Sequence, residues 1–290
     1  MGWERVLEHY SREDVGQEIA EYCAGRWVAL HCEELDKKGK QIMIRYDKDR
    51  RPLRLSSKDD VRKAILDYAK HRPRAIYASA HVYRKLGSRW SVVDRENVLA
   101  SSPTLDIDSK DGDWKSVVEK AMQVIRLLEK YGIVKSVFFK WSGRGAHVHV
   151  HQNAFSEEIR RRIGPMDIAY SVTRFIAGMI GPEGGAIVEA VVDAQRVFTT
   201  PLSFHRYVDR VAVCVPPESL SEFHVDWTYP ESYRHFPEAW RRFSPGEGDG
   251  LAEVAFAKIG PYLAGKTRRR RHKPLDEEII ETMRRLEGLL

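Results

Sequence analysis

Two aspartates separated by one residue lie in the short apolar segment Leu105, Asp106, Ile107, Asp108. Alternate residues of a strand face the same side, so both carboxylates would share one face while Leu105 and Ile107 enter the core. Two neighbouring carboxylates repel each other unless a cation lies between them, and hard oxygen ligands favour Mg²⁺ or Mn²⁺. The pair therefore predicts either a divalent metal site for a transferring phosphate or a solvent-facing pair at a strand end.

Further residues that could bind phosphate oxygens or a metal ion follow along the chain. The loop 142–145 (SGRG) would let backbone amides approach phosphate oxygens, with Arg144 adding positive charge, although a tight hairpin without a ligand would have the same sequence. Asp193 closes the expected strand 186–193 and is either a third metal ligand or a strand-end cap. The residues downstream that suit a triphosphate are Arg196, Ser203, His205 and Arg206.

The segment 147–151 (HVHVH) alternates strictly, which predicts a half-buried strand with His147 and His149 on one face. The spacing of these two histidines occurs in zinc sites, so with the aspartates they allow a metal-dependent phosphohydrolase. A single His147 that hydrogen-bonds a phosphate is the competing interpretation.

The elements that must position these residues follow from hydrophobic periodicity and from turn signals. Helices and strands alternate through the middle of the chain, which predicts an α/β protein whose helices pack on a sheet. The expected strands are 27–31, 41–46, 75–83, 104–108, 133–139, 147–151, 186–193 and 210–217, and the expected helices of this region are 58–71, 113–130 and 156–179.

The composition is that of a globular protein, with 290 residues of which 42% are hydrophobic and 31% are charged. This excludes fibrous and low-complexity classes. No apolar stretch approaches the roughly 18 to 20 residues of a membrane helix, and the first residues are charged, so we expect a cytoplasmic protein without membrane contact. Cys23, Cys32 and Cys214 lack metal-binding spacing, and we expect them to be buried.

The net charge of +6 is concentrated in one short segment near the end of the chain. We expect a domain over 1–265, followed by a basic linker and an amphipathic helix over 266–290. Such a basic arm suits the phosphate backbone of a nucleic acid or is a solvated linker. A non-catalytic single-strand-binding protein that stacks bases on Trp90, Trp227 or Trp240 is therefore a further alternative. The cations of the arm are Lys266, Arg268, Arg269, Arg270, Arg271 and Lys273.

Three motifs in this order resemble the archaeo-eukaryotic primase superfamily, in particular the catalytic small subunit of archaeal primase. They are DID at 106–108, SGRGAH at 142–147, and Asp193 followed by Arg196, Pro201, Ser203 and His205. The resemblance extends from about residue 45 to 216. In the third motif this chain has Thr199 where the family has a second arginine, and Leu202 where the family has a glycine.

The resemblance implies a fold: a mixed sheet like that of an RNA-recognition palm, packed on a second α/β unit, with the active site between them. It implies a template-directed nucleotidyltransferase, a primase or primase-like DNA polymerase, in the domain 1–265. An end-joining polymerase that fills gaps is the alternative within the family, and for its 5′ phosphate the chain offers Lys37, Lys38, Lys40 and Arg45.

The resemblance also implies a ligand set. Two Mg²⁺ or Mn²⁺ ions and no zinc are expected, and the partners are a DNA template and primer, nucleoside triphosphates, and a primase large subunit or an end-joining ligase. The implied catalytic and metal-binding residues are Asp106, Asp108 and Asp193. The implied nucleotide-binding residues are Ser142, Gly143, Arg144, His147, Arg196, Ser203 and His205.

Overall fold

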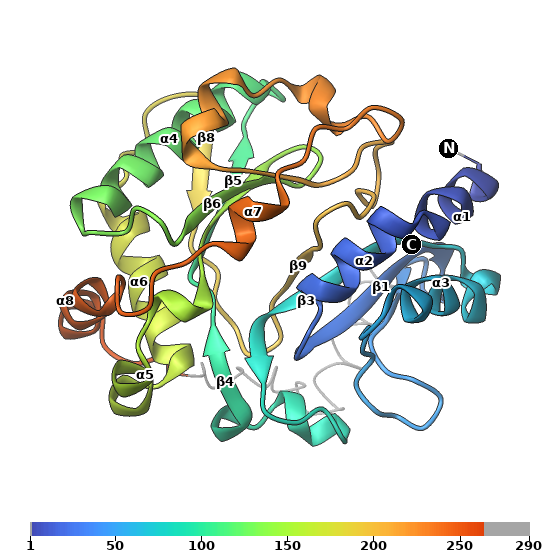
Figure 1. Ribbon diagram of the computed structural model, residues 1–290, viewed down its shortest axis with the longest axis horizontal. Coiled ribbons are helices and arrows are strands. Elements are labelled where there is room, and N and C mark those ends of the chain that lie inside the picture. The colour runs from blue at the N-terminus through green and yellow to red at the C-terminus, as the bar shows by residue number, and fades with distance from the viewer. Residues whose placement is uncertain (1, 264–290) are drawn as a thin grey trace, which may run out of the picture.

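The framework consists of two antiparallel sheets, each covered by helices (Figure 1). We describe residues 2–263 from a computed structural model. The predicted basic linker and C-terminal helix at 266–290, with the six cations of the arm, lie outside the described residues.

The first sheet contains the N-terminal strands in the order β2-β1-β3-β4, with β9 also paired to β3. Three helices pack against it through apolar residues such as Val15, Ile19 and Ile65. Ser57 caps the third of these helices by accepting a hydrogen bond from the amide of Asp60. The strands are β1 (Arg26–Leu35), β2 (Gln41–Ile44), β3 (Pro73–Tyr83), β4 (Val98–Ser101) and β9 (Val197–Thr199), and the helices are α1 (Trp3–Ser11), α2 (Glu13–Tyr22) and α3 (Lys58–Asp67).

The second sheet has the order β10-β6-β7-β5-β8. Apart from β10, its four strands follow along the chain as strand, helix, two strands, a helical segment and strand, which is the split β-α-β arrangement of RNA-recognition folds. The predicted palm-like sheet packed on a second α/β unit is therefore confirmed. The strands are β5 (Thr104–Ser109), β6 (Val137–Trp141), β7 (Ala146–Val150), β8 (Ala186–Glu189) and β10 (Val213–Val215), and the helices are α4 (Trp114–Lys130), α5 (Glu157–Ile163), α6 (Pro165–Met179), α7 (Pro237–Arg241) and α8 (Asp249–Ile259).

Short 3-10 turns connect these elements. They are η1 (Ala69–His71), η2 (Arg89–Val92), η3 (Arg95–Asn97), η4 (Gln152–Ala154), η5 (Pro217–Glu222) and η6 (Val225–Thr228).

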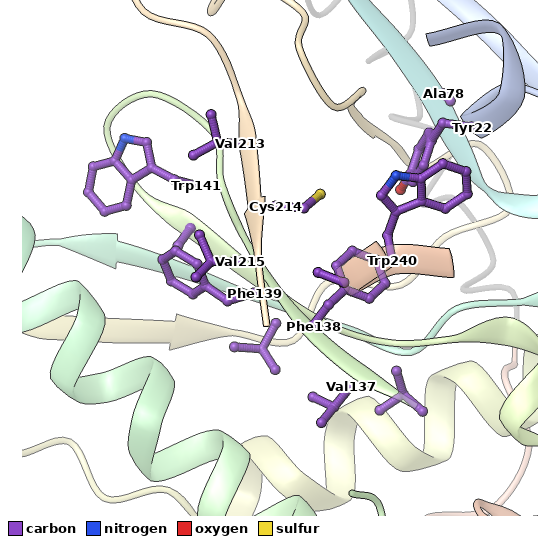
Figure 2. Packing of buried hydrophobic residues seen from close by; sticks show 14 of the residues in the cluster. Tyr22, Ala78, Val137, Phe138, Phe139, Trp141, Val213, Cys214, Val215 and Trp240 are labelled. Carbon is purple, nitrogen blue, oxygen red and sulfur yellow. The ribbon is translucent and has the colours of Figure 1, made fainter. Parts of the chain in front are cut away.

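The second sheet is apolar on both faces near β6 and β10 (Figure 2). Trp141 pairs with Val213 in the register, and both side chains pack on one face, while Cys214 and Phe138 point to the other face, toward Trp240. The strands are therefore fixed from both sides, as expected for a sheet enclosed between helices and a second sheet. The three cysteines are free and buried, as predicted.

Some predicted element boundaries were wrong. The expected helix 156–179 is two helices, because Gly164 adopts a φ of 101° and Pro165 begins the next helix at its first turn. The expected strand 186–193 ends at Glu189. The expected helix 58–71 ends at Asp67 and continues as the 3-10 turn η1. Over residues 2–263, no helix is both long and apolar enough to cross a membrane.

Candidate active site

A cavity of about 320 Å³ lies between the two sheets and collects most of the residues singled out from the sequence. One wall comes from β5, β7 and the loop between β6 and β7, and the opposite wall comes from β3, β9 and the segment that follows β9. The residues that line it are Tyr77, Asp106, Asp108, Ser142, Arg144, Gly145, His147, Arg196, Val197, Phe198, Thr199, His205, Arg206 and Tyr207.

The two aspartates lie on β5 at alternate positions and therefore share a face, as predicted. Asp106 is paired in the sheet register with His147 on β7, and His147 Nε2 lies 3.3 Å from Asp106 Oδ1. On the other side, Arg196 Nη2 donates a hydrogen bond of 2.8 Å to Asp106 Oδ2. Asp106 is thus held between two nitrogen groups, whereas Asp108 is exposed.

This difference gives the two carboxyl groups opposite pKa shifts. Burial raises the pKa of Asp106, but the attraction of His147 and Arg196 outweighs it and holds that pKa below its usual range. Burial and the nearby charge of Asp106 raise the pKa of Asp108. The pair is therefore an anionic site in which Asp108 carries an unfavourable charge that a bound cation would stabilise.

The glycines of the loop 142–145 permit two close approaches. Gly143 has a φ of 129°, and a Cβ there would lie 2.5 Å from the His205 ring. A Cβ on Gly145 would lie 2.5 Å from the carbonyl oxygen of Ile107 and 2.6 Å from Asp108 Oδ1. The loop is closed by a hydrogen bond of 2.9 Å from the Ser142 amide to the Gly145 carbonyl. These glycines therefore allow the loop to pack directly on β5 and on His205.

The wall opposite the aspartates is cationic. His205 Nδ1 accepts hydrogen bonds from the amides of Tyr207 (3.1 Å) and Val208 (3.2 Å), so its Nε2 carries the proton in the neutral ring. Burial, and then the charges of Arg206 and Arg144, lower the pKa of His205 to about 4. Arg206 and a neutral imidazole N–H donor thus line this side of the cavity, and Arg144 lines it from the loop 142–145. Together they form a donor set suited to phosphate oxygens.

Ser203 and Asp193 are not brought into the cavity. Ser203 is buried, and its Oγ accepts a hydrogen bond of 2.8 Å from the amide of Ile76. Asp193 lies in the loop beyond β8, where its carboxylate accepts a hydrogen bond of 2.7 Å from the amide of Gln195. Its carbonyl oxygen lies 3.0 Å from Nε2 of the buried His81. Neither residue lines the cavity in this structure, and their direct roles stay predictions.

Sequence reasoning missed several residues of the cavity. Phe198 packs its ring 4.7 Å from that of His147, and the Arg196 guanidinium lies 5.2 Å from the Phe198 ring centre. Tyr77 and Tyr207 complete the apolar part of the walls. Strand β9, which carries Phe198, spans Val197–Thr199 and is too short to produce a periodic signal.

Of the histidine pair, His147 lines the cavity and His149 does not. His149 is buried, its Nδ1 lies 2.8 Å from Thr104 Oγ1, and its ring stacks on Phe138. Burial also holds the pKa of His149 well below its usual range. Within residues 2–263, no group of three or more His, Cys, Asp or Glu side chains is placed to hold a metal ion. The described residues thus give the metallohydrolase interpretation little support beyond the spacing.

Of the three tryptophans proposed as stacking platforms, Trp90 is 63% exposed. Trp240 is buried and donates a hydrogen bond to Glu18, so the expectation that it is exposed was wrong. Trp227 is half-buried beneath the Arg234 guanidinium, which lies 4.1 Å from its ring centre.

The comparisons with known proteins place the fold. No protein-family model matches the chain. No curated protein matches its sequence. Among solved structures, the chain is similar to the polymerase domain from Mycobacterium tuberculosis Ligase D in complex with DNA, with a TM-score of 0.52, 13% identity, and coverage of 90% of each chain. The likeness covers nearly the whole described chain and shows that the two proteins share a fold.

Proposed function

We propose that the protein is a template-directed nucleotidyltransferase, a primase or primase-like DNA polymerase, whose active site is the cavity between the two sheets. The observation that carries the proposal is the arrangement of charge: Asp106 and Asp108 on one wall face His205 and Arg206 on the other, and Arg144 on the loop 142–145 lines the same cavity. Polyphosphate transfer needs an anionic site for cations and a cationic site for the phosphates, within one cavity.

The residues fit a divalent metal ion. Asp106 and Asp108 offer hard oxygen ligands on one face of β5, and burial together with the charge of Asp106 raises the pKa of Asp108, so a cation bound there would favour its ionised form. When bound there, Mg²⁺ or Mn²⁺ would polarise phosphate oxygens and activate a hydroxyl nucleophile. The order of the three sequence motifs is the basis for two further parts of the proposal. They are Asp193 as a third metal ligand and a second metal ion.

The protein's own residues would then orient the reactants. Arg144, Arg206 and the Nε2–H of His205 would bind the triphosphate oxygens, and the loop 142–145 would bring its backbone close to them. The pair His147 and Arg196 keeps Asp106 ionised and fixed in direction.

In the reaction, the primer 3′ oxygen would bond to the α-phosphorus while the bond to pyrophosphate breaks. The hydroxyl proton would leave to water. Positioning and charge stabilisation would account for most of the catalysis, as in other phosphoryl transfers.

Nucleotide incorporation on a primed template with Mg²⁺ or Mn²⁺ tests the proposal. Asp108→Asn should abolish incorporation while the protein stays folded. The matched control is Asp67→Asn, an exposed aspartate at the end of α3, which should keep wild-type activity. Incorporation by Asp108→Asn at a rate near that of the wild type would refute the assignment.

A gap-filling polymerase for end joining is the second candidate, favoured by the likeness to the polymerase domain of Ligase D. The nucleic-acid substrate on which synthesis occurs distinguishes the two candidate functions. Products on an unprimed single-stranded template support a primase, and synthesis confined to a gapped duplex with a 5′ phosphate supports the repair polymerase. NTPs and dNTPs should be supplied separately in both arms.

A further inference from the structure

A second cavity, of about 500 Å³, lies at the end of β3 away from the active site and is lined by cations. Arg51 and Arg54 come from the segment after β2, and Arg84 and Lys85 come directly after β3. No aspartate or glutamate lines this cavity. Over residues 2–263, none of these four side chains makes an ion pair or a hydrogen bond, and all four are exposed.

The backbone beneath these four cations is held in place. The Val28 amide donates to the Leu53 carbonyl (2.9 Å), which fixes the segment carrying Arg51 and Arg54 to β1. The Arg84 amide donates to the carbonyl of Asn97 (2.9 Å), and the Asn97 side-chain amide donates to the Lys85 carbonyl (2.7 Å). The four positive charges are therefore kept close together although they repel each other, which is an arrangement that a bound anion stabilises.

The floor of the cavity adds a buried cation. Arg26 is 5% exposed, and its guanidinium donates to two neutral oxygens, the Ser79 carbonyl (2.8 Å) and Gln152 Oε1 (2.9 Å). A buried guanidinium without a carboxylate partner is costly unless an anion lies nearby. This observation is independent of the exposed arginines and also favours an anionic ligand.

An exposed aromatic side chain continues the cationic surface. The two chain segments that carry these cations, 45–56 and 83–93, also line a further hollow that includes Arg50, Arg89 and Trp90. The Arg89 guanidinium lies 4.5 Å from the ring centre of Trp90. The acidic residues of these two segments and of η3 do not line either hollow; they are Asp47, Asp49, Asp94 and Glu96. Cations next to an exposed indole are typical of single-strand binding sites.

We propose that this surface, formed by Arg51, Arg54, Arg84 and Lys85 with Trp90 beside them, binds the phosphodiester backbone of a single nucleic-acid strand. The inference rests on the proposed function, because it supplies a second contact for the strand that serves as template. Tyr77 of the active site lies in β3, and Arg84 directly follows the end of that strand. At roughly 3.3 Å per residue, the two residues are about 20 Å apart along the chain. A strand would need about six nucleotides to reach both sites, at roughly 3.4 Å per nucleotide.

The test is the salt dependence of binding of a fluorescein-labelled single-stranded 12-nucleotide DNA to the full chain, followed by anisotropy in EDTA. Arg54→Ala/Arg84→Ala should weaken binding about tenfold at low salt and reduce the slope of log K against log salt by about 0.7 for each lost phosphate contact. The matched control is Arg126→Ala/Lys130→Ala, which removes the same charge from the exposed face of α4. It should leave the slope within error of the wild type.

Two further arms make the assay specific. Trp90→Ala should weaken binding roughly tenfold without changing the salt slope, because stacking releases no counterions. The DNA is used with and without a 5′ phosphate, and equal losses for the two forms support backbone binding. A loss confined to the 5′-phosphorylated strand, or equal slope changes in both double variants, would overturn the proposal.

Failure of the strand-binding proposal can be distinguished from failure of the proposed nucleotidyltransferase function. If the wild-type protein incorporates no nucleotide but Arg54→Ala/Arg84→Ala still lowers the slope, the strand-binding surface stands and the nucleotidyltransferase assignment fails.

Discussion

The two aspartates of the active site should respond oppositely to neutralisation, because they differ in their surroundings. Asp106 is ion-paired with Arg196 and lies against His147, whose pKa is lowered by burial, whereas Asp108 is exposed and repelled by Asp106. In metal-free buffer we therefore expect Asp108→Asn to stabilise the protein and Asp106→Asn to destabilise it. From the sequence alone, removal of either carboxylate would relieve the same repulsion and spare the fold.

The magnitudes follow from the geometry. Alternate residues of a strand are about 6.6 Å apart, so two unit charges there interact with about 0.6 kcal/mol in water and about 2.5 kcal/mol at an effective dielectric constant near 20. Because Asp108 is exposed, solvent screening places the gain from Asp108→Asn near the lower value, about 0.5 to 1 kcal/mol. Asp106→Asn weakens charge-assisted hydrogen bonding, a loss of about 1 to 3 kcal/mol.

Thermal unfolding in EDTA at pH 7 measures both effects. A chain of this size shifts by about 2 to 4 °C per kcal/mol, so Asp108→Asn should raise the Tm by about 1 to 4 °C and Asp106→Asn should lower it by several degrees. The pKa of Asp108 is raised on folding, so its ionisation opposes folding at neutral pH, and the gain should vanish below about pH 4, where the carboxyl is protonated in both states. Equal destabilisation by both variants would refute this account of the pair.

Other predictions test the surrounding structure. Arg144→Ala should raise the KM for nucleotide several-fold with a smaller effect on kcat, and an unchanged KM would remove Arg144 from the phosphate site. Gly145→Ala should abolish incorporation and lower the Tm, because the added Cβ would lie 2.5 Å from the Ile107 carbonyl oxygen. By comparison, Gly178→Ala on the exposed face of α6 should raise the stability by about 1 kcal/mol. Glu18→Gln should lower the stability at pH 7 by roughly 1 to 3 kcal/mol. Burial raises the pKa of Glu18, but its hydrogen bonds and charge interactions with His235, Trp240 and Arg241 outweigh burial and lower this pKa. The stability from Glu18 is present above its unfolded pKa and is lost as the pH falls through the folded value, so urea unfolding of wild type and variant should converge in acid.

Much of the site could be predicted because strand periodicity determines which residues share a face. The alternation in 105–108 placed Asp106 and Asp108 on one side of β5, and the alternation in 147–151 predicted the strand that carries His147. That strand is buried on both faces rather than half-buried as predicted, and only the register with β5 shows that His147 pairs with Asp106. The helix 113–130 was also predicted correctly, because Asp113 accepts hydrogen bonds from the amides of Lys115 and Ser116 and so caps its first turn.

The rest depends on contacts between segments distant in sequence, which leave no local pattern. Ser203 is buried because its hydroxyl bonds to the amide of Ile76 on β3, and no spacing near Ser203 indicates this. Trp240 is buried because Glu18 on α2 accepts its indole hydrogen bond. The strand β9 forms because β3 offers it a partner, not because of its own sequence.

Leu202 shows how the fold persists where the sequence departs from the family pattern. This residue, which stands where the family has a glycine, has a φ of 58°, in the left-handed region that glycine adopts without strain. Its amide donates to the Ala212 carbonyl and its carbonyl oxygen lies 2.8 Å from His9 Nε2, so the turn before Ser203 is fixed from both sides. A left-handed backbone at leucine destabilises the folded state by about 1 to 2 kcal/mol, and burial of the leucine side chain stabilises it by roughly 2 kcal/mol. A left-handed backbone at this turn is therefore compatible with a buried leucine side chain.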